Sequence, residues 1–158
     1  MRSPVDPPAA ASQATEGEAQ PRDKPGVLVV DDEHLVRSMV QLGLERNGFH
    51  VWLASGGREA IGLYRKHRDS IAVVLLDVHM PGLDGPQTLD ALREVAPQVV
   101  ACFMSGDACA NEPEELRQRG VAYFLAKPFR LDHLANVLRL LVQAVPADLL
   151  PPGGRRQE

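Results

Sequence analysis

Cysteine and aromatic residues are scarce in this sequence. Its 158 residues include two cysteines, Cys102 and Cys109, and only 4% aromatic residues. Two cysteines give neither a disulfide framework nor the ligand spacing of a zinc site. The five histidines are scattered along the chain, so capture of a metal ion by His or Cys side chains is not expected.

Long apolar runs and a positive charge are missing as well. No run approaches the roughly 20 residues of a membrane-spanning helix, and the first residues lack the apolar centre of a signal peptide. Acidic residues outnumber basic ones, 21 against 17, for a formal charge of −4. This balance does not favour binding to nucleic acid or to an anionic membrane. We therefore expect a cytoplasmic protein that contacts neither nucleic acid nor membrane.

The composition fits one globular domain, with 44% hydrophobic and 24% charged residues. Residues 1–25 are rich in Pro, Ala and Glu and contain almost no large apolar side chains, so we expect a disordered tail there. Residues 146–158 have a similar composition and predict a second disordered tail. The domain should occupy residues 26–145. Because no second domain is expected after its last helix, we predict a stand-alone domain.

Strand-like apolar runs alternate with helical patterns through this domain. Several runs are continuously apolar, as in parallel strands covered on both faces. The runs are Val27–Val30, Val51–Ala54, Ile71–Leu76, Val99–Met104 and Val121–Leu125. Five strand–helix units in series predict an α/β, doubly wound (βα)5 fold, with a five-stranded parallel sheet and helices on both faces.

The helical patterns differ in strength. In the first, Val36, Met39 and Val40 are spaced to share one face. Asp84, followed by Gly-Pro-Gln, predicts a capped start for the third helix. The fourth is the weakest, because Leu116 is its only large apolar residue. We expect that helix to be short, marginally packed and able to shift at low energetic cost.

Polar residues follow the predicted strands, at the edge where parallel α/β sheets bind ligands. They are Asp31, Asp32, Asp77, Ser105 and Lys127. Taken singly, an Asp after a strand usually caps a helix, the serine could lie in a turn, and the lysine could be a surface charge. Asp77, however, directly follows six apolar residues, where an unpaired buried carboxylate would be costly. The combination therefore indicates a functional site.

Phosphoryl transfer is the chemistry that this combination favours. Clustered carboxylates suit Mg²⁺, which would also offset their mutual repulsion. A carboxylate such as Asp77 can attack phosphorus and form an acyl phosphate. The transferred group needs positioned positive charge and hydrogen-bond donors, which Mg²⁺, Lys127 and Ser105 would supply.

Four motifs resemble the receiver domains of response regulators in two-component signalling. They occur in the family's order and span nearly the whole predicted domain. The motifs are Val27–Glu33 (VLVVDDE), Leu75–Gly85 (LLDVHMPGLDG), Met104–Gly106 (MSG) and Lys127–Phe129 (KPF). The resemblance implies a flavodoxin-like fold with strand order 2-1-3-4-5.

The resemblance also implies roles for the matching residues. Asp77 would be the phosphoacceptor. The Mg²⁺ ligands would be Asp31, Asp32, Asp77 and the backbone carbonyl of His79.

Further implied roles concern the response to phosphorylation. Ser105 would move to bond the phosphoryl group, and Lys127 would pair with it. Phe124 falls at the family's switch position and would change rotamer with Ser105, whereas Tyr123 lies on the opposite pleat and is interpreted as packing. The bond between Lys127 and Pro128 would be cis.

Two residues at the predicted rim suggest control of the phosphate lifetime. His79 lies two residues after Asp77, and Asp107 lies two residues after Ser105. In the family, these positions flank the path of the hydrolytic water. His79 and Asp107 either approach each other and alter the lifetime, or both lie solvated at the rim.

The predicted donor is the phosphohistidine of a sensor histidine kinase or of a histidine phosphotransfer protein. Phosphorylation would bias the face formed by the fourth helix, fifth strand and fifth helix, so the output is expected to be contact with another, unidentified protein. The domain would catalyse only its own phosphorylation and dephosphorylation and is not expected to be an enzyme for outside substrates.

Three alternatives are weaker. A small phosphatase with an aspartyl-phosphate intermediate would need a second Asp as general acid, but His79 stands two residues after Asp77. A receiver that acts as a scaffold without phosphorylation would not need the intact set of acidic and basic residues. A flavin-binding module would need a phosphate-cradling loop after the first strand.

Overall fold

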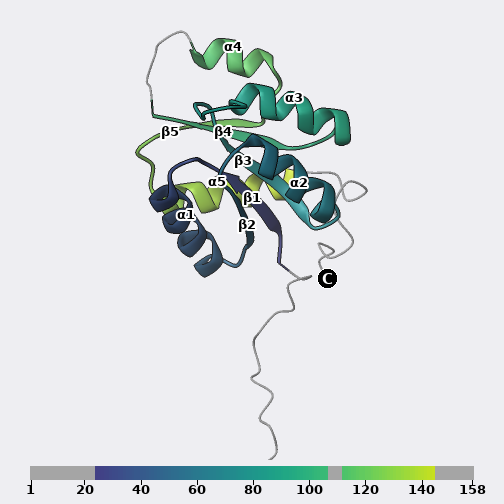
Figure 1. Ribbon diagram of the computed structural model, residues 1–158. Coiled ribbons are helices and arrows are strands. Elements are labelled where there is room, and N and C mark those ends of the chain that lie inside the picture. The colour runs from purple at the N-terminus through teal and green to yellow at the C-terminus, as the bar shows by residue number, and fades with distance from the viewer. Residues whose placement is uncertain (1–23, 107–111, 145–158) are drawn as a thin grey trace, which may run out of the picture.

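Strands and helices alternate through the described part of the chain. The computed structural model describes residues 24–106 and 112–144 (Figure 1). The strands are β1 (Gly26–Val30), β2 (His50–Ala54), β3 (Ile71–Asp77), β4 (Ala101–Ser105) and β5 (Tyr123–Ala126). The helices are α1 (His34–Arg46), α2 (Gly57–His67), α3 (Gly85–Val95), α4 (Glu112–Gln118) and α5 (Leu131–Ala144).

The five strands form one parallel sheet in the order β2-β1-β3-β4-β5. Helices α1 and α5 cover one face, and α2, α3 and α4 cover the other (Figure 1). The predicted fold class, strand order and two-sided covering are thus confirmed. In such a sheet, every strand ends at the same edge, so residues that directly follow the strands are brought together.

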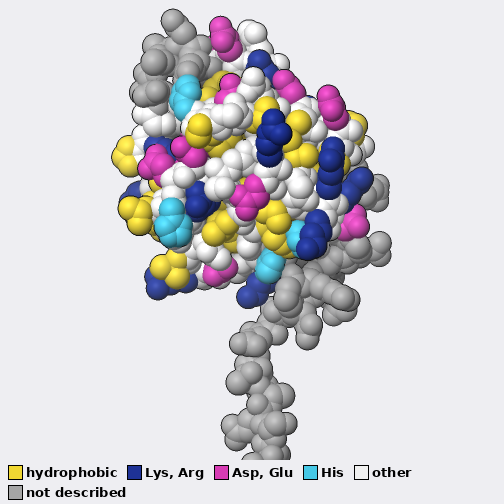
Figure 2. Space-filling model, in the orientation of Figure 1, with side chains coloured by type: hydrophobic (Ala, Val, Ile, Leu, Met, Phe, Trp, Pro, Cys, Tyr) yellow, Lys and Arg dark blue, Asp and Glu magenta, His cyan; other side chains and the backbone are white. Residues whose placement is uncertain are grey.

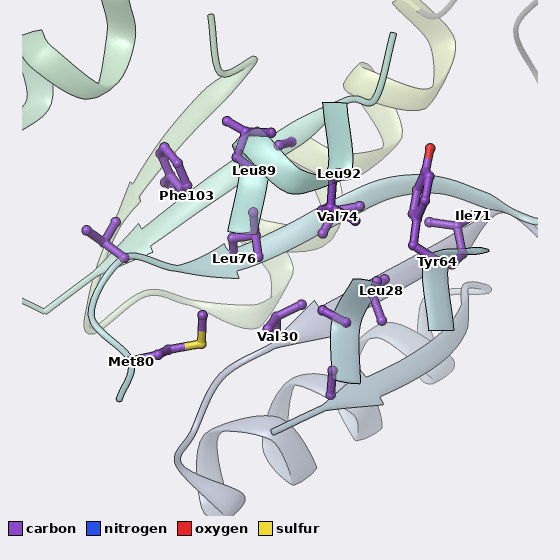
Figure 3. Packing of buried hydrophobic residues seen from close by; sticks show 14 of the residues in the cluster. Leu28, Val30, Tyr64, Ile71, Val74, Leu76, Met80, Leu89, Leu92 and Phe103 are labelled. Carbon is purple, nitrogen blue, oxygen red and sulfur yellow. The ribbon is translucent and has the colours of Figure 1, made fainter. Parts of the chain in front are cut away.

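The core has two layers, one on each side of the sheet. Figure 3 shows the layer beneath α2 and α3, where Leu28, Leu76 and Phe103 from the strands meet Leu89 and Leu92 of α3. The alternate residues of the same strands contribute to the other layer, against α1 and α5. All five residues of β1 are buried, which explains why its sequence is continuously apolar.

The predicted face of α1 was wrong for one residue, Met39. Met39 does not share the inward face of α1 but is 49% exposed, on the side of Leu35 and Leu42. The inward residues include Val40 and Gly43. A Cβ at Gly43 would lie 2.8 Å from a side-chain methyl group of Leu131, so glycine allows α1 and α5 to pack closely at this point.

Several element boundaries differ from the predicted ones by one or two residues. The fourth strand begins at Ala101 rather than Val99, and the fifth begins at Tyr123 rather than Val121. The cap of α3 is formed as predicted: the Asp84 carboxylate accepts the Gln87 N–H at 2.8 Å, and the Gln87 side chain accepts the Asp84 N–H at 3.0 Å.

Helix α4 is short, as predicted, with 7 residues and a buried Leu116. The predicted tails lie outside the described residues, except for Lys24 and Pro25, and so does Asp107. Within the described ranges, no helix has both the length and the apolar character needed to cross a membrane.

Close packing between α2 and α3 leaves no room for a side chain at Gly57. A Cβ atom there would collide with the Thr88 hydroxyl and lie 2.7 Å from Cβ of Leu83. Thr88 cannot easily yield, because its hydroxyl donates to the Asp84 carbonyl at 2.7 Å. We predict that Gly57→Ala lowers the free energy of unfolding by about 1–3 kcal/mol, measured by urea denaturation.

The matched control lies in the same helix. Gly62 has open space where a Cβ would be added, so Gly62→Ala should leave stability unchanged or raise it by up to about 1 kcal/mol through helix propensity. Equal effects of the two substitutions would contradict the packing argument.

Candidate functional site

The ends of four strands bring five polar residues to one edge of the sheet. Asp31 and Asp32 directly follow β1, Asp77 is the last residue of β3, Ser105 is the last residue of β4, and Lys127 directly follows β5. The structure thus brings together the residues that the sequence predicted for one site, although Asp31 and Lys127 are 96 positions apart.

Three carboxylates form the centre of this site. Oxygen atoms of Asp31, Asp32 and Asp77 all lie within 4.8 Å of one another. Asp31 is fully buried and Asp77 is 5% exposed, whereas Asp32 is exposed to solvent. Two of the three negative charges are therefore held away from water, where their mutual repulsion is strong.

Lys127 supplies the positive charge between the two buried carboxylates. Its Nζ lies 2.7 Å from Oδ2 of Asp31 and 3.5 Å from Oδ2 of Asp77. Lys127 thus lies closer to Asp31 than to Asp77, the predicted phosphoacceptor. Its backbone N–H donates to the Ser105 carbonyl at 2.8 Å, which joins the ends of β4 and β5. The Lys127–Pro128 peptide bond is cis.

The electrostatics follow from this arrangement. Burial raises the pKa of Asp77 from 3.8 to about 6, the charge of Asp31 adds to the increase, and Lys127 acts against it. Burial acts to lower the pKa of Lys127, but the hydrogen bond to Asp31 and the charge of Asp77 outweigh it, so that pKa is raised. One ammonium group does not balance three carboxylates.

The loop after β3 is held close to Asp77. The Val78 N–H donates to the Met104 carbonyl, and the Gly85 N–H donates to the Val78 carbonyl, both at 2.9 Å. A Cβ on Gly85 would lie 2.6 Å from the Asp77 carbonyl oxygen, so glycine allows this close approach. The His79 N–H donates to Oδ1 of Asp77 at 3.4 Å.

The predicted rim and switch residues lie around this centre. His79 is exposed, but Asp107 is outside the described residues, so their predicted approach stays a prediction. Ser105 is buried at the end of β4. Phe124 is half-buried against the core layer beneath α2 and α3. Tyr123, on the other pleat, packs edge-to-face with His133, with 6.4 Å between the ring centroids.

Sequence reasoning missed one residue of the site, Arg37. Its Nη1 donates to the backbone carbonyl of Asp31 at 2.6 Å. The only sequence signal was an arginine at the end of the first turn of the helix that follows the acidic pair.

The donor set fits a hard divalent cation. The cluster offers carboxylate oxygens from three residues, an environment that Mg²⁺ prefers, and its excess negative charge favours a cation. The residues able to hold the ion are Asp31, Asp32 and Asp77, with the backbone carbonyl of His79 as the fourth predicted ligand.

Comparison with known proteins decides the family. The chain matches the family model described as response regulator receiver domain over residues 27–139, which runs from the second residue of β1 into α5. The chain belongs to the response regulator receiver domain family. The predicted resemblance to response regulators of two-component signalling is confirmed.

Curated relatives agree with this assignment. The chain is 34% identical to the response regulator MprA of Mycolicibacterium vanbaalenii over 122 residues, which are 77% of this chain and 52% of the relative. It is 33% identical to the transcriptional regulatory protein PrrA of Mycobacterium tuberculosis over 119 residues, 75% of this chain and 50% of PrrA. The chain thus spans about half the length of these relatives.

Solved structures agree as well. The receiver domain of the Francisella response regulator 1452 is 30% identical, with a TM-score of 0.68, covering 78% of this chain and 100% of that one. The Vibrio cholerae chemotaxis protein CheY4 is 28% identical, with a TM-score of 0.69, covering 75% of this chain and 98% of CheY4.

The raised pKa of Asp77 predicts a pH-dependent stability. Between pH 4 and about 6, the unfolded chain releases this proton while the folded domain retains it, so the metal-free fold loses stability as pH rises. Asp77→Asn removes the charge and should be more stable than the wild type at pH 7.5 in EDTA. The full pKa shift of Asp77 corresponds to about 3 kcal/mol of unfolding free energy. Because the site can relax around the charge, we expect Asp77→Asn to gain about 1–2 kcal/mol.

Urea denaturation at several pH values measures this gain. The difference between Asp77→Asn and wild type should fall towards zero near pH 4, where Asp77 is protonated in the folded state. Asp69→Asn, at an exposed position after α2, should show no such pH dependence. A gain that is the same at pH 4 and 7.5 would refute the electrostatic explanation.

Proposed function

We propose that this receiver domain accepts a phosphoryl group on Asp77 from the phosphohistidine of a sensor histidine kinase or histidine phosphotransfer protein. The observation that carries the proposal is the position of Asp77, with Lys127 Nζ 3.5 Å from Oδ2 and carboxylates of Asp31 and Asp32 within 4.8 Å. A nucleophile, a cation and a potential metal site thus meet at one point.

The proposed step is an exchange of bonds at phosphorus. A carboxylate oxygen of Asp77 forms the new O–P bond, and the N–P bond of the phosphohistidine breaks, with its electron pair leaving on the imidazole. Lys127 pairs with the negative oxygens of the transferred group, and the Ser105 hydroxyl donates to one of them. Mg²⁺ held by Asp31, Asp32, Asp77 and the His79 carbonyl would neutralise further charge on those oxygens.

Phosphorylation would then change the shape of one face. The phosphoryl group adds about −1.5 to −2 charge. This charge would draw Lys127 away from Asp31, and it would draw Ser105 inward. Phe124 would move into the space vacated by Ser105. The face formed by α4, β5 and α5 would thereby shift between two states and select a protein partner.

The proposed partners are proteins only. Lys, Arg, Asp and Glu side chains are interspersed on the face in Figure 2, and the described residues there show no broad basic area. Among the relatives, PrrA is named a transcriptional regulatory protein, and a Brucella abortus relative is named the sensor kinase CckA. For this domain we propose a cytoplasmic location, output through protein contact, and no turnover of outside substrates.

Incubation with acetyl phosphate and Mg²⁺ tests the proposal. Intact-protein mass spectrometry should detect an adduct of roughly +80 Da on the wild type. The adduct should be absent from Asp77→Asn and present in Asp69→Asn, in which an exposed carboxylate is lost instead. Hydroxylamine, which cleaves acyl phosphates, should remove it.

Each alternative has its own outcome. An adduct retained in Asp77→Asn would exclude Asp77 as the acceptor. Steady release of phosphate from unrelated esters would favour a phosphatase. A wild-type protein that binds its partners but gains no adduct would be a scaffold receiver.

The pairing of Lys127 with Asp31 predicts competition with Mg²⁺. Because Nζ of Lys127 lies 2.7 Å from Oδ2 of Asp31, a bound cation must share or replace this contact. Lys127→Met should tighten Mg²⁺ binding by about fivefold, since loss of a neighbouring positive charge removes on the order of 1 kcal/mol of repulsion. Isothermal titration calorimetry measures the change, with Lys66→Met, at an exposed position of α2, as the control. Weaker binding by Lys127→Met would contradict this prediction.

A further inference from the structure

Every polar atom of Asp31 has a hydrogen-bond partner. Its N–H donates to the Ala54 carbonyl at 3.2 Å. Its Oδ1 accepts the Glu33 N–H at 2.9 Å, and its Oδ2 accepts Nζ of Lys127 at 2.7 Å. The remaining atom, the carbonyl oxygen, accepts Nη1 of Arg37 at 2.6 Å. Arg37 thus makes the contact that fixes the orientation of the peptide group between Asp31 and Asp32.

This peptide group joins Asp31, whose carboxylate is held by Glu33 and Lys127, to Asp32. Asp31 is held by the sheet on one side, but Asp32 and Glu33 already belong to the loop between β1 and α1. A hydrogen bond from a charged guanidinium to the Asp31 carbonyl restrains rotation of that loop. It therefore affects the placement of Asp32, which is exposed and has less surrounding protein to hold it.

The charge of Arg37 also acts on Glu59, in the first turn of α2. The Glu59 carboxylate accepts the Ser55 N–H and the Ser55 hydroxyl, both at 2.8 Å. These hydrogen bonds lower the pKa of Glu59, and the nearby positive charge of Arg37 adds to the effect. Arg37 is partly buried, and its charge acts on Glu59 as well as on the Asp31 main chain.

We propose that Arg37 is a positioning residue for the acidic cluster: by bonding the Asp31 carbonyl, it holds Asp31 and Asp32 in the arrangement that binds a divalent cation. Groups outside the ligand shell that orient metal ligands commonly change metal affinity by about 10- to 100-fold when they are replaced. The inference rests on the proposed Mg²⁺ site.

The direction in which Mg²⁺ affinity changes when Arg37 is replaced distinguishes a positioning role from a simple effect of its charge. Arg37 is positive, so removal of its charge alone would strengthen the binding of another cation. Loss of the hydrogen bond to the Asp31 carbonyl would weaken binding, because the ligand loop is released. We expect Arg37→Met to bind Mg²⁺ about tenfold more weakly than the wild type in isothermal titration calorimetry.

A conservative variant sharpens the test. Arg37→Lys keeps the charge but replaces the planar guanidinium with a single ammonium group on a flexible stem, so it should recover part of the affinity, to about threefold below wild type. Arg46→Met, at an exposed position in the last turn of the same helix, is the matched control and should bind Mg²⁺ as the wild type does. Thermal unfolding of each variant verifies that the protein titrated is folded.

A second measurement needs no metal. In EDTA, amide hydrogen exchange of Asp32, Glu33 and His34 should be faster in Arg37→Met than in the wild type, and unchanged in Arg46→Met. Mg²⁺ affinity of Arg37→Met equal to or tighter than wild type would overturn the proposal. If the wild type binds no Mg²⁺, the proposed function fails separately, and unchanged exchange in the loop would still overturn the role of Arg37.

Discussion

The carboxylates of Asp31 and Asp77 lie almost fully withdrawn from water at the carboxyl edge of the sheet, with the ammonium group of Lys127 between them. Buried charges are tolerated only where they are paired and hydrogen-bonded. Asp31 directly follows β1, Asp77 ends β3 and Lys127 directly follows β5, so the three meet only when the sheet has assembled from its centre to one edge. The site is therefore a product of the whole fold and not of any one segment.

The same arrangement leaves the metal-free site with too much negative charge. Lys127 neutralises one carboxylate and Arg37 contributes a second positive charge at the Asp31 main chain, yet the pKa of Asp77 is still raised to about 6. Such perturbed groups are typical of functional sites, where stability is exchanged for reactivity. The excess negative charge would give the cluster affinity for a divalent cation, and that cation together with Lys127 would then attract the negative oxygens of a phosphoryl group.

Much of this could be predicted from the sequence, because the strongest signals are local. Continuous apolar runs marked the strands, and the position of a polar residue directly after each run placed it at the common edge. The face of α1 could not be predicted in this way. Leu35, Met39 and Leu42 form an apolar stripe as regular as the buried one, and only the structure shows that the face with Gly43, close to Leu131 of α5, is the buried one.

Details of the site were beyond sequence reasoning for a different reason. Asp31 and Asp77 carry the same functional group, so nothing in the sequence indicates that Lys127 lies nearer to Asp31. Arg37 resembles any arginine on an exposed helix, and its contact is with a main-chain carbonyl, which every residue possesses. Contacts of this kind depend on backbone orientation, which only the assembled structure defines.

Under the proposed mechanism, the path from the acceptor to α4 is short. The backbone hydrogen bond from Lys127 to Ser105 joins the two residues that would contact the phosphoryl group. Phe124 lies three residues before Lys127 and packs against the same core layer as Leu116, the buried residue of α4.

The link from α4 to α3 is weak by comparison. Arg119, which directly follows α4, pairs with Asp90 at 3.2 Å, and both side chains are exposed, so this pair contributes less than about 1 kcal/mol. A change of a few kcal/mol at the acceptor is enough to reverse a two-state equilibrium. Helix α4 is short and, among its side chains whose burial is described, Leu116 is the buried one, so α4 is the element that we propose such a change would move.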